Sequence, residues 1–66
     1  MEYSRDDLIE AKRQIDSTLH KLRGVVKTLR DKGKPERYKS QITLAERRIR
    51  AFETANFLIE RELSGM

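Results

Sequence analysis

Apolar residues that recur at steps of three and four constrain this chain more than any other feature of its sequence. Such steps match the turn of an α-helix, about 3.6 residues, so each series marks one face of a helix. The first series contains Leu8, Ala11, Ile15, Leu19, Leu22, Val25, Val26 and Leu29. The second contains Tyr38, Ile42, Ala45, Ile49, Phe52, Asn56, Ile59 and Leu63. The chain is therefore predicted to be all-α, with helices over about 5–31 and 36–63.

Helix start and stop signals support these bounds. Ser4 can accept a hydrogen bond from the backbone N–H of Asp7, and the Asp7 side chain can reach back to Ser4 as in a capping box. Gly33 suits the end of the first helix, and Pro35 suits the first turn of the second, where its missing N–H costs nothing.

The short connection between the two helices predicts a hairpin. Four residues, 32–35, force the helices to be antiparallel neighbours, so residues 1–66 form a single helical hairpin domain. The predicted layers pair Leu29 with Tyr38, Leu22 with Ala45, Ile15 with Phe52, and Leu8 with Ile59.

A chain of 66 residues rarely has enough core to be stable without disulfides, a metal or a partner chain. With no Cys and one His, we expect no disulfide, no metal site and no cofactor. The apolar arc of each helix spans roughly 100–120°, more than one neighbouring helix covers. We therefore expect a homodimer of hairpins that forms a four-helix bundle with coiled-coil packing. The predicted interface residues are Leu8, Ile15, Leu19, Leu22, Val26, Ile42, Ile49, Phe52 and Ile59.

Charge is distributed unevenly along the predicted rod. Residues 21–50, at the turn end, carry eleven Lys and Arg against three Asp and Glu, a net charge of +8. The remaining residues carry four against eight, a net charge of −4. In a dimer with its turns at opposite ends, each basic region lies beside its partner's acidic region. We therefore expect the antiparallel arrangement of the two hairpins.

The basic turn end also allows an alternative function, in which the chain is a regulator that binds nucleic acid. Clustered cations supply nonspecific affinity for phosphate backbones. The turn end has no aromatic residue for base stacking beyond Tyr38 and no DNA- or RNA-reading motif, so this reading ranks second. The candidate contacts are Arg23, Lys27, Arg30, Lys34, Arg37, Arg47 and Arg48.

Asn56 stands at a position that calls for an apolar residue, and two interpretations are open. A buried and paired Asn can set the register or oligomeric state of a helical bundle. Alternatively, a small rotation of the helix places Ala55 in the core and Asn56 at its edge.

Asp16, Ser17 and His20 are close enough along a helix to contact one another, and they are read as ordinary surface polar residues whose spacing allows a side-chain contact between Asp16 and His20. They are predicted to lie on the outward face of the first helix, where they lack the oxyanion hole and cleft that a catalytic triad needs. We therefore expect no catalytic residue and no enzymatic activity.

Leu44, Ala51 and Leu58 form a thinner apolar line on the outer face of the second helix. The line is read either as scattered surface residues or as a contact for a larger oligomer or another protein.

The segment SQITLAERRIRAFETANFLIEREL, with EAKRQIDSTLHKL upstream, resembles small helical proteins of Gram-positive bacteria that have no assigned activity. In shape the predicted hairpin is similar to the RNA-binding plasmid regulator Rop, but the residues do not match. No function is carried over from either resemblance.

Together these features predict a small helical protein that self-associates and serves as an interaction or adaptor module. The absence of Cys and of a signal-peptide pattern favours a cytoplasmic location. No apolar run approaches the ~20 residues of a membrane span, so no membrane association is expected.

Overall fold

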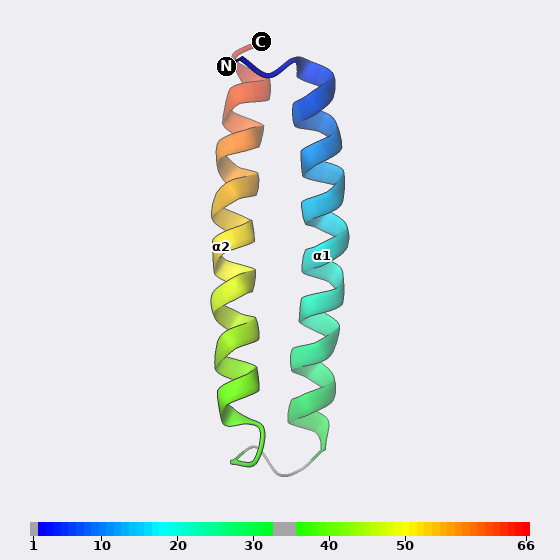
Figure 1. Cartoon of the computed structure of the whole chain (residues 1–66), viewed down its shortest axis with the longest axis vertical. Coiled ribbons are helices and arrows are strands. Elements are labelled where there is room, and N and C mark those ends of the chain that lie inside the picture. The colour runs from blue at the N-terminus through cyan, green and yellow to red at the C-terminus, as the bar shows by residue number, and fades with distance from the viewer. Residues whose placement is uncertain (1, 33–35) are drawn as a thin grey trace.

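The computed structural model describes residues 2–32 and 36–66 and consists of two antiparallel helices that lie side by side (Figure 1). Helix α1 spans Arg5–Asp31, and α2 spans Lys39–Ser64. The hairpin is a rod of 46 × 18 × 15 Å, with both termini at one end and the connection at the other. The predicted two-helix fold is confirmed, and the described residues contain no strand.

Helix α1 begins where the sequence predicts, because Ser4 and Asp7 form the expected capping box. The Asp7 backbone N–H donates to Ser4 Oγ at 3.1 Å, and the Ser4 N–H donates to Asp7 Oδ2 at 3.1 Å. Two N–H groups that the helix leaves without partners are satisfied in this way.

Helix α2 begins at Lys39, three residues later than predicted, and Glu36, Arg37 and Tyr38 form turns. Tyr38 precedes the helix without a side-chain hydrogen bond, and the first turn of α2 contains no acidic residue. Arg37 and Lys39 place cations at the positive end of the helix dipole, so the start of α2 lacks the favourable charge that Asp6 and Asp7 give to the start of α1. The predicted roles of Gly33 and Pro35 fall outside the described residues.

The predicted layers between the helices are wrong by more than one helical turn. They place Ala51 opposite Asp16, whereas the structure places Asn56 there, in hydrogen-bond contact with Asp16. The difference is five positions along α2. The connection spans residues 32–38, three residues more than the four that the sequence suggests, which shifts α2 in this direction but accounts for only part of the difference.

The core of the hairpin is thin. Its buried apolar side chains are Leu19, Leu29, Ile42 and Ala45, and no side chain of the described residues is completely enclosed. Leu19 and Ile42, which were predicted to contact a second chain, are thus already covered by the hairpin itself. The other seven predicted interface residues are only half-buried, namely Leu8, Ile15, Leu22, Val26, Ile49, Phe52 and Ile59.

Neither helix has a segment long and apolar enough to cross a lipid bilayer within the part of the chain that the structure describes.

Candidate functional site

The two long flanks of the hairpin, on either side of the contact between the helices, differ in chemistry. One of them carries three ion pairs between α1 and α2. Lys12 Nζ lies 3.1 Å from Glu60 Oε1, Arg23 Nη2 lies 3.4 Å from Glu53 Oε2, and Arg30 Nη2 lies 2.7 Å from Glu46 Oε1. We call this side, with Asp16 and these six residues, the ion-paired flank. Each pair is partly exposed, so each contributes little to the stability of the hairpin.

Lys12 lies at the terminal end of the ion-paired flank and contacts two carboxylates there. It lies seven positions before Leu19, at a point of the first series where an apolar residue is expected, and it is half-buried. Its Nζ contacts Asp16 Oδ2 at 3.0 Å as well as Glu60. One ammonium thus separates two carboxylates that would otherwise face each other across the hairpin. Hydrogen bonds to Asp16 and Glu60 raise the pKa of Lys12 above its ordinary value.

Asn56 occupies a core position, with only 8% of its surface exposed, whereas Ala55 beside it is half-buried. The structure therefore matches the interpretation in which Asn56 is buried, rather than the one in which Ala55 replaces it. Asn56 Nδ2 donates to Asp16 Oδ1 at 2.7 Å. Its Oδ1 is buried and accepts no hydrogen bond from the described residues. A buried amide held on one side only is costly, which makes the Asp16 contact important for the hairpin.

The prediction that Asp16 points outward is wrong. Asp16 lies at the edge of the contact between the helices, where Lys12 and Asn56 both donate to it. Ser17 and His20 are exposed, as predicted. That Asn56 is its partner on α2 follows only when the register of the two helices is known.

The carboxylate of Asp16 should make the stability of the hairpin dependent on pH in acid. The hydrogen bonds from Lys12 and then Asn56 lower the pKa of Asp16 below its ordinary value. The stabilisation is therefore present above the ordinary pKa, about 3.9, and is lost as the pH falls through the lower pKa of the folded chain. The difference in unfolding free energy between the parent and Asp16→Asn should shrink from pH 6 to pH 3, as measured by urea denaturation followed by circular dichroism.

Glu36→Gln is the matched control for this measurement, because Glu36 lies in the turn region and makes no ion pair within the described residues. Its difference from the parent should stay near zero across the same pH range. A difference for Asp16→Asn that does not change with pH would contradict the assignment.

The opposite side of the hairpin is apolar. At about 100° per residue, Ala11, Thr18 and Val25 lie on the other side of α1 from Asp16 and Arg23. We define the apolar flank as Leu8, Ala11, Ile15, Thr18, Leu22 and Val25 of α1, with Phe52, Ala55 and Ile59 of α2. All are half-buried except Val25, which is 47% exposed.

Thr18 does not interrupt the apolar flank, because its hydroxyl donates to the backbone carbonyl of Gln14 at 3.0 Å. The O–H donor of the hydroxyl is satisfied within the helix. The centre of the flank can therefore be covered by apolar atoms without leaving this donor unpaired.

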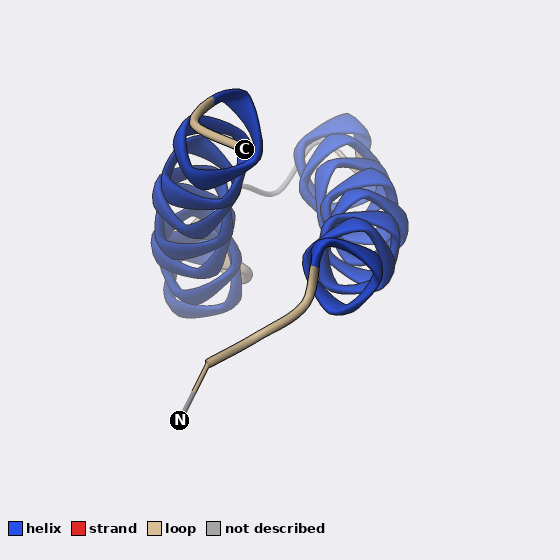
Figure 2. Ribbon diagram, turned by 90° about the horizontal axis from the view of Figure 1, so that it is seen from above, coloured by secondary structure: helices blue, strands red, loops and turns tan. Residues whose placement is uncertain are grey.

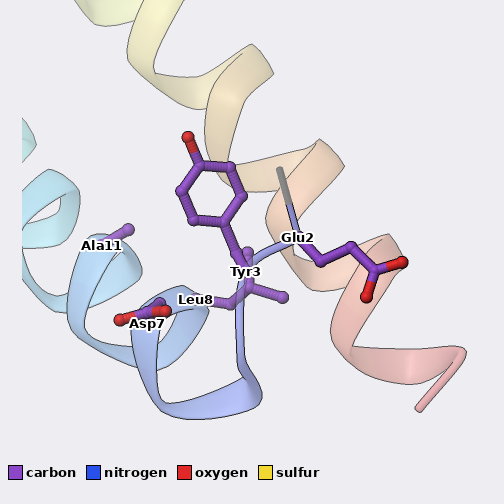
Figure 3. Close-up of a pocket in the computed structure, with 5 residues that line it drawn as sticks. All are labelled: Glu2, Tyr3, Asp7, Leu8 and Ala11. Carbon is purple, nitrogen blue, oxygen red and sulfur yellow. The ribbon is translucent and has the colours of Figure 1, made fainter.

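A hollow of about 410 Å³ lies at the terminal end of the apolar flank and is lined by Glu2, Tyr3, Asp7, Leu8 and Ala11 (Figure 3). The segment before α1 leads away to one side of the two helices (Figure 2). Tyr3, which this segment carries, is 61% exposed and stands beside Leu8. The hollow gives this end of the flank a concave, largely apolar surface.

The candidate nucleic-acid contacts have different environments in the structure. Arg23 and Arg30 bind Glu53 and Glu46, and the Arg37 guanidinium lies 5.7 Å from the centre of the Tyr38 ring. Lys34 falls outside the described residues. The remaining three candidates, Lys27, Arg47 and Arg48, are exposed.

The outer line of α2 is exposed as predicted, with 49% of Leu44 and 55% of Leu58 accessible. Phe57, which belongs to none of the predicted sites, is 62% exposed and lies beside the ion-paired flank. Lys12 also belongs to none of the predicted sites, although the seven-residue spacing of Lys12, Leu19 and Val26 marks a shared helical face. Among the described residues, no group of three or more His, Asp and Glu side chains could hold a metal ion.

No known protein family matches this chain, and comparisons with curated proteins and with solved structures find no match either. The two flanks of the hairpin are therefore the features from which a function can be inferred.

Proposed function

We propose that this chain is a small, non-enzymatic interaction module that works as a homodimer of hairpins packed into a four-helix bundle. The observation that carries the proposal is the apolar flank, where Leu8, Ile15, Leu22 and Phe52 remain half-exposed in a chain with no completely enclosed side chain. Covering these side chains is favourable by about 25 cal/mol per Å² of apolar surface.

A second copy of the chain is the partner that the charge distribution favours. The +8 region of residues 21–50 at the turn end and the −4 region at the terminal end make the rod electrically polar. A second copy that runs in the opposite direction is complementary to the first in charge along the whole rod. Like charges lie beside each other if the turns are at the same end, so the proposed dimer has its turns at opposite ends.

The ion-paired flank faces water in this arrangement. Its carboxylates and cations already satisfy one another across the hairpin, so burying them against another chain would cost desolvation without new pairing. The second chain is therefore proposed to cover the apolar flank, because only that flank gains stability from being covered.

The proposal predicts a folded dimer at low micromolar concentration, observed by sedimentation equilibrium together with far-ultraviolet circular dichroism. Helix content and dimer fraction should fall together on dilution, because a single hairpin has too thin a core to be stable alone. A helical monomer that keeps its helix content at low micromolar concentration would contradict the proposal.

Nucleic-acid binding is the second candidate function, favoured by the exposed Lys27, Arg47 and Arg48 near the turn end. Phosphate contacts should weaken steeply with added salt. Because Arg23 and Arg30 are engaged with Glu53 and Glu46, fewer cations are available to phosphate than the sequence suggests. A low-salt gel shift with duplex RNA and duplex DNA tests this candidate, and the absence of a shift at micromolar protein would remove it.

A further inference from the structure

We infer that Val25 of one copy seats in the hollow beside Tyr3, Leu8 and Ala11 of a second copy, and that the reciprocal contact forms at the same time. The inference rests on the proposed homodimer and specifies which surface forms it and in which register. It assigns the contact to the apolar flank rather than to the outer line of α2.

The protruding part of this contact is Val25. It is one of the exposed large apolar side chains of the chain, at 47%, and it lies on the apolar flank toward the turn end. A lone exposed Val needs no explanation, but Val25 is in line with Thr18 and Ala11 at seven-residue steps. Two helical turns separate each of these residues from the next, about 10 Å along the axis.

The receiving part is the hollow at the terminal end of the same flank. Its volume of about 410 Å³ exceeds what one Val side chain fills, and Leu8, Ala11 and the Tyr3 ring supply apolar walls (Figure 3). Ala11 contributes to the space because its side chain ends at Cβ. Protrusion and hollow thus occupy opposite ends of one flank.

Symmetry relates these two ends. Thr18 is the middle residue of α1, Arg5–Asp31, and lies seven positions from both Ala11 and Val25. A two-fold axis that passes by Thr18 therefore exchanges the level of Val25 with that of Ala11. Such an axis runs the two copies in opposite directions, so a self-complementary contact forms twice at once. With the turns at the same end, Val25 would meet Val25 and hollow would meet hollow.

Charge around the contact is complementary in the same arrangement. Glu2 and Asp7 line the hollow, and both are exposed. The end of the partner that reaches the hollow is the basic turn end, where Arg48 is exposed and lies seven positions before Ala55 on the same flank of α2. Rim pairs of this kind add little affinity but disfavour the wrong orientation.

Single cysteines test the inference directly, because the natural chain contains none. Ala11→Cys and Val25→Cys chains are mixed, unfolded together, refolded and oxidised. The mixture should give a disulfide that joins the two variants, whereas each variant alone should give none. Ala11 and its own copy would be about 21 Å apart along the axis, too far for a disulfide, which needs Cα atoms within about 7 Å.

Thr18→Cys alone should form a disulfide-linked dimer, because Thr18 lies beside the axis. Ser17→Cys is the matched control, since Ser17 is its exposed neighbour on the outward side of α1 and should stay reduced. All four variants should match the helix content of the parent by circular dichroism before oxidation. A Cys variant of Ala11, Thr18 or Val25 that does not match is replaced by the Ser variant at the same position, and the dimer affinity of that variant is measured instead.

The outcomes separate this inference from the proposed function. Self-linking of Ala11→Cys would place the turns at the same end and overturn the inference. A dimer by sedimentation without any of the expected disulfides would also overturn it, and would leave self-association through another surface, such as the outer line of α2. A folded monomer would overturn both.

Discussion

Replacing Phe52 with Ala should cost about 3–5 kcal/mol of stability, a large share of what so small a fold can have. Phe52 is only half-buried within its own hairpin, so truncation in a lone hairpin should cost considerably less. The full loss requires that a second chain covers the exposed part of the ring. Urea denaturation at several protein concentrations measures both the size of the effect and its dependence on association.

Phe57→Ala is the matched control, because it removes the same ring from a position that is 62% exposed and lies beside the ion-paired flank. Its cost should stay below about 1 kcal/mol, as for most exposed substitutions. A Phe52→Ala chain as stable as the parent would contradict the proposed interface. Equal losses for the two variants would mean that the ring at Phe57 is covered as well, which the proposed dimer does not allow.

Reversing the charge of Lys27, Arg47 and Arg48 to Glu should weaken the dimer by at least about tenfold at low salt. Each altered charge changes the sign of contacts worth ~0.2–1 kcal/mol, a dimer contains two sets of three, and tenfold corresponds to about 1.4 kcal/mol. The three residues make no ion pair within the described residues, so the folded hairpin itself should be little affected. Sedimentation equilibrium at low and high salt measures the dissociation constant.

Added salt should reduce the difference between this variant and the parent, because charges more than about 8 Å apart are screened at physiological ionic strength. The control exchanges the same residues without changing charge, as Lys27→Arg, Arg47→Lys and Arg48→Lys, and should dimerise like the parent. A Glu variant that dimerises more tightly than the parent at low salt would instead mean that the two turns lie at the same end.

The helices themselves follow from local chemistry, and this is why the sequence predicts them well. Apolar steps of three and four identify both helices, and the Ser4–Asp7 capping box fixes the start of α1. The start of α2 has no comparable local signal. Pro35 suggests an early start, whereas the structure begins the helix at Lys39, and the first turn of α2 contains no acidic residue to favour helix formation there.

The ion-paired flank could not be predicted because it depends on register. Glu46, Glu53 and Glu60 are spaced at seven residues and could face many positions of α1. An error of five positions in the register gives each of them, and Asp16 as well, the wrong partner. The apolar flank depends less on register, since Leu8, Ile15 and Leu22 stay on one side of α1 in any alignment, and sequence analysis included all three in the predicted interface.

The hydrogen bond between Asn56 and Asp16 also bears on the misaligned forms that a two-helix chain could adopt. Sliding one helix by a full heptad keeps every apolar position facing another, so the hydrophobic contact alone hardly distinguishes the aligned hairpin from the slipped one. The slide would bring Asn56 to Ile9 or to Arg23 in place of Asp16, and neither side chain offers an acceptor. The buried Nδ2 group would then lose its acceptor, a cost of about 1–3 kcal/mol that the aligned hairpin avoids. One polar residue inside a thin core can thus favour a single register. An apolar replacement such as Asn56→Leu is therefore expected to keep both helices but to allow more than one register between them.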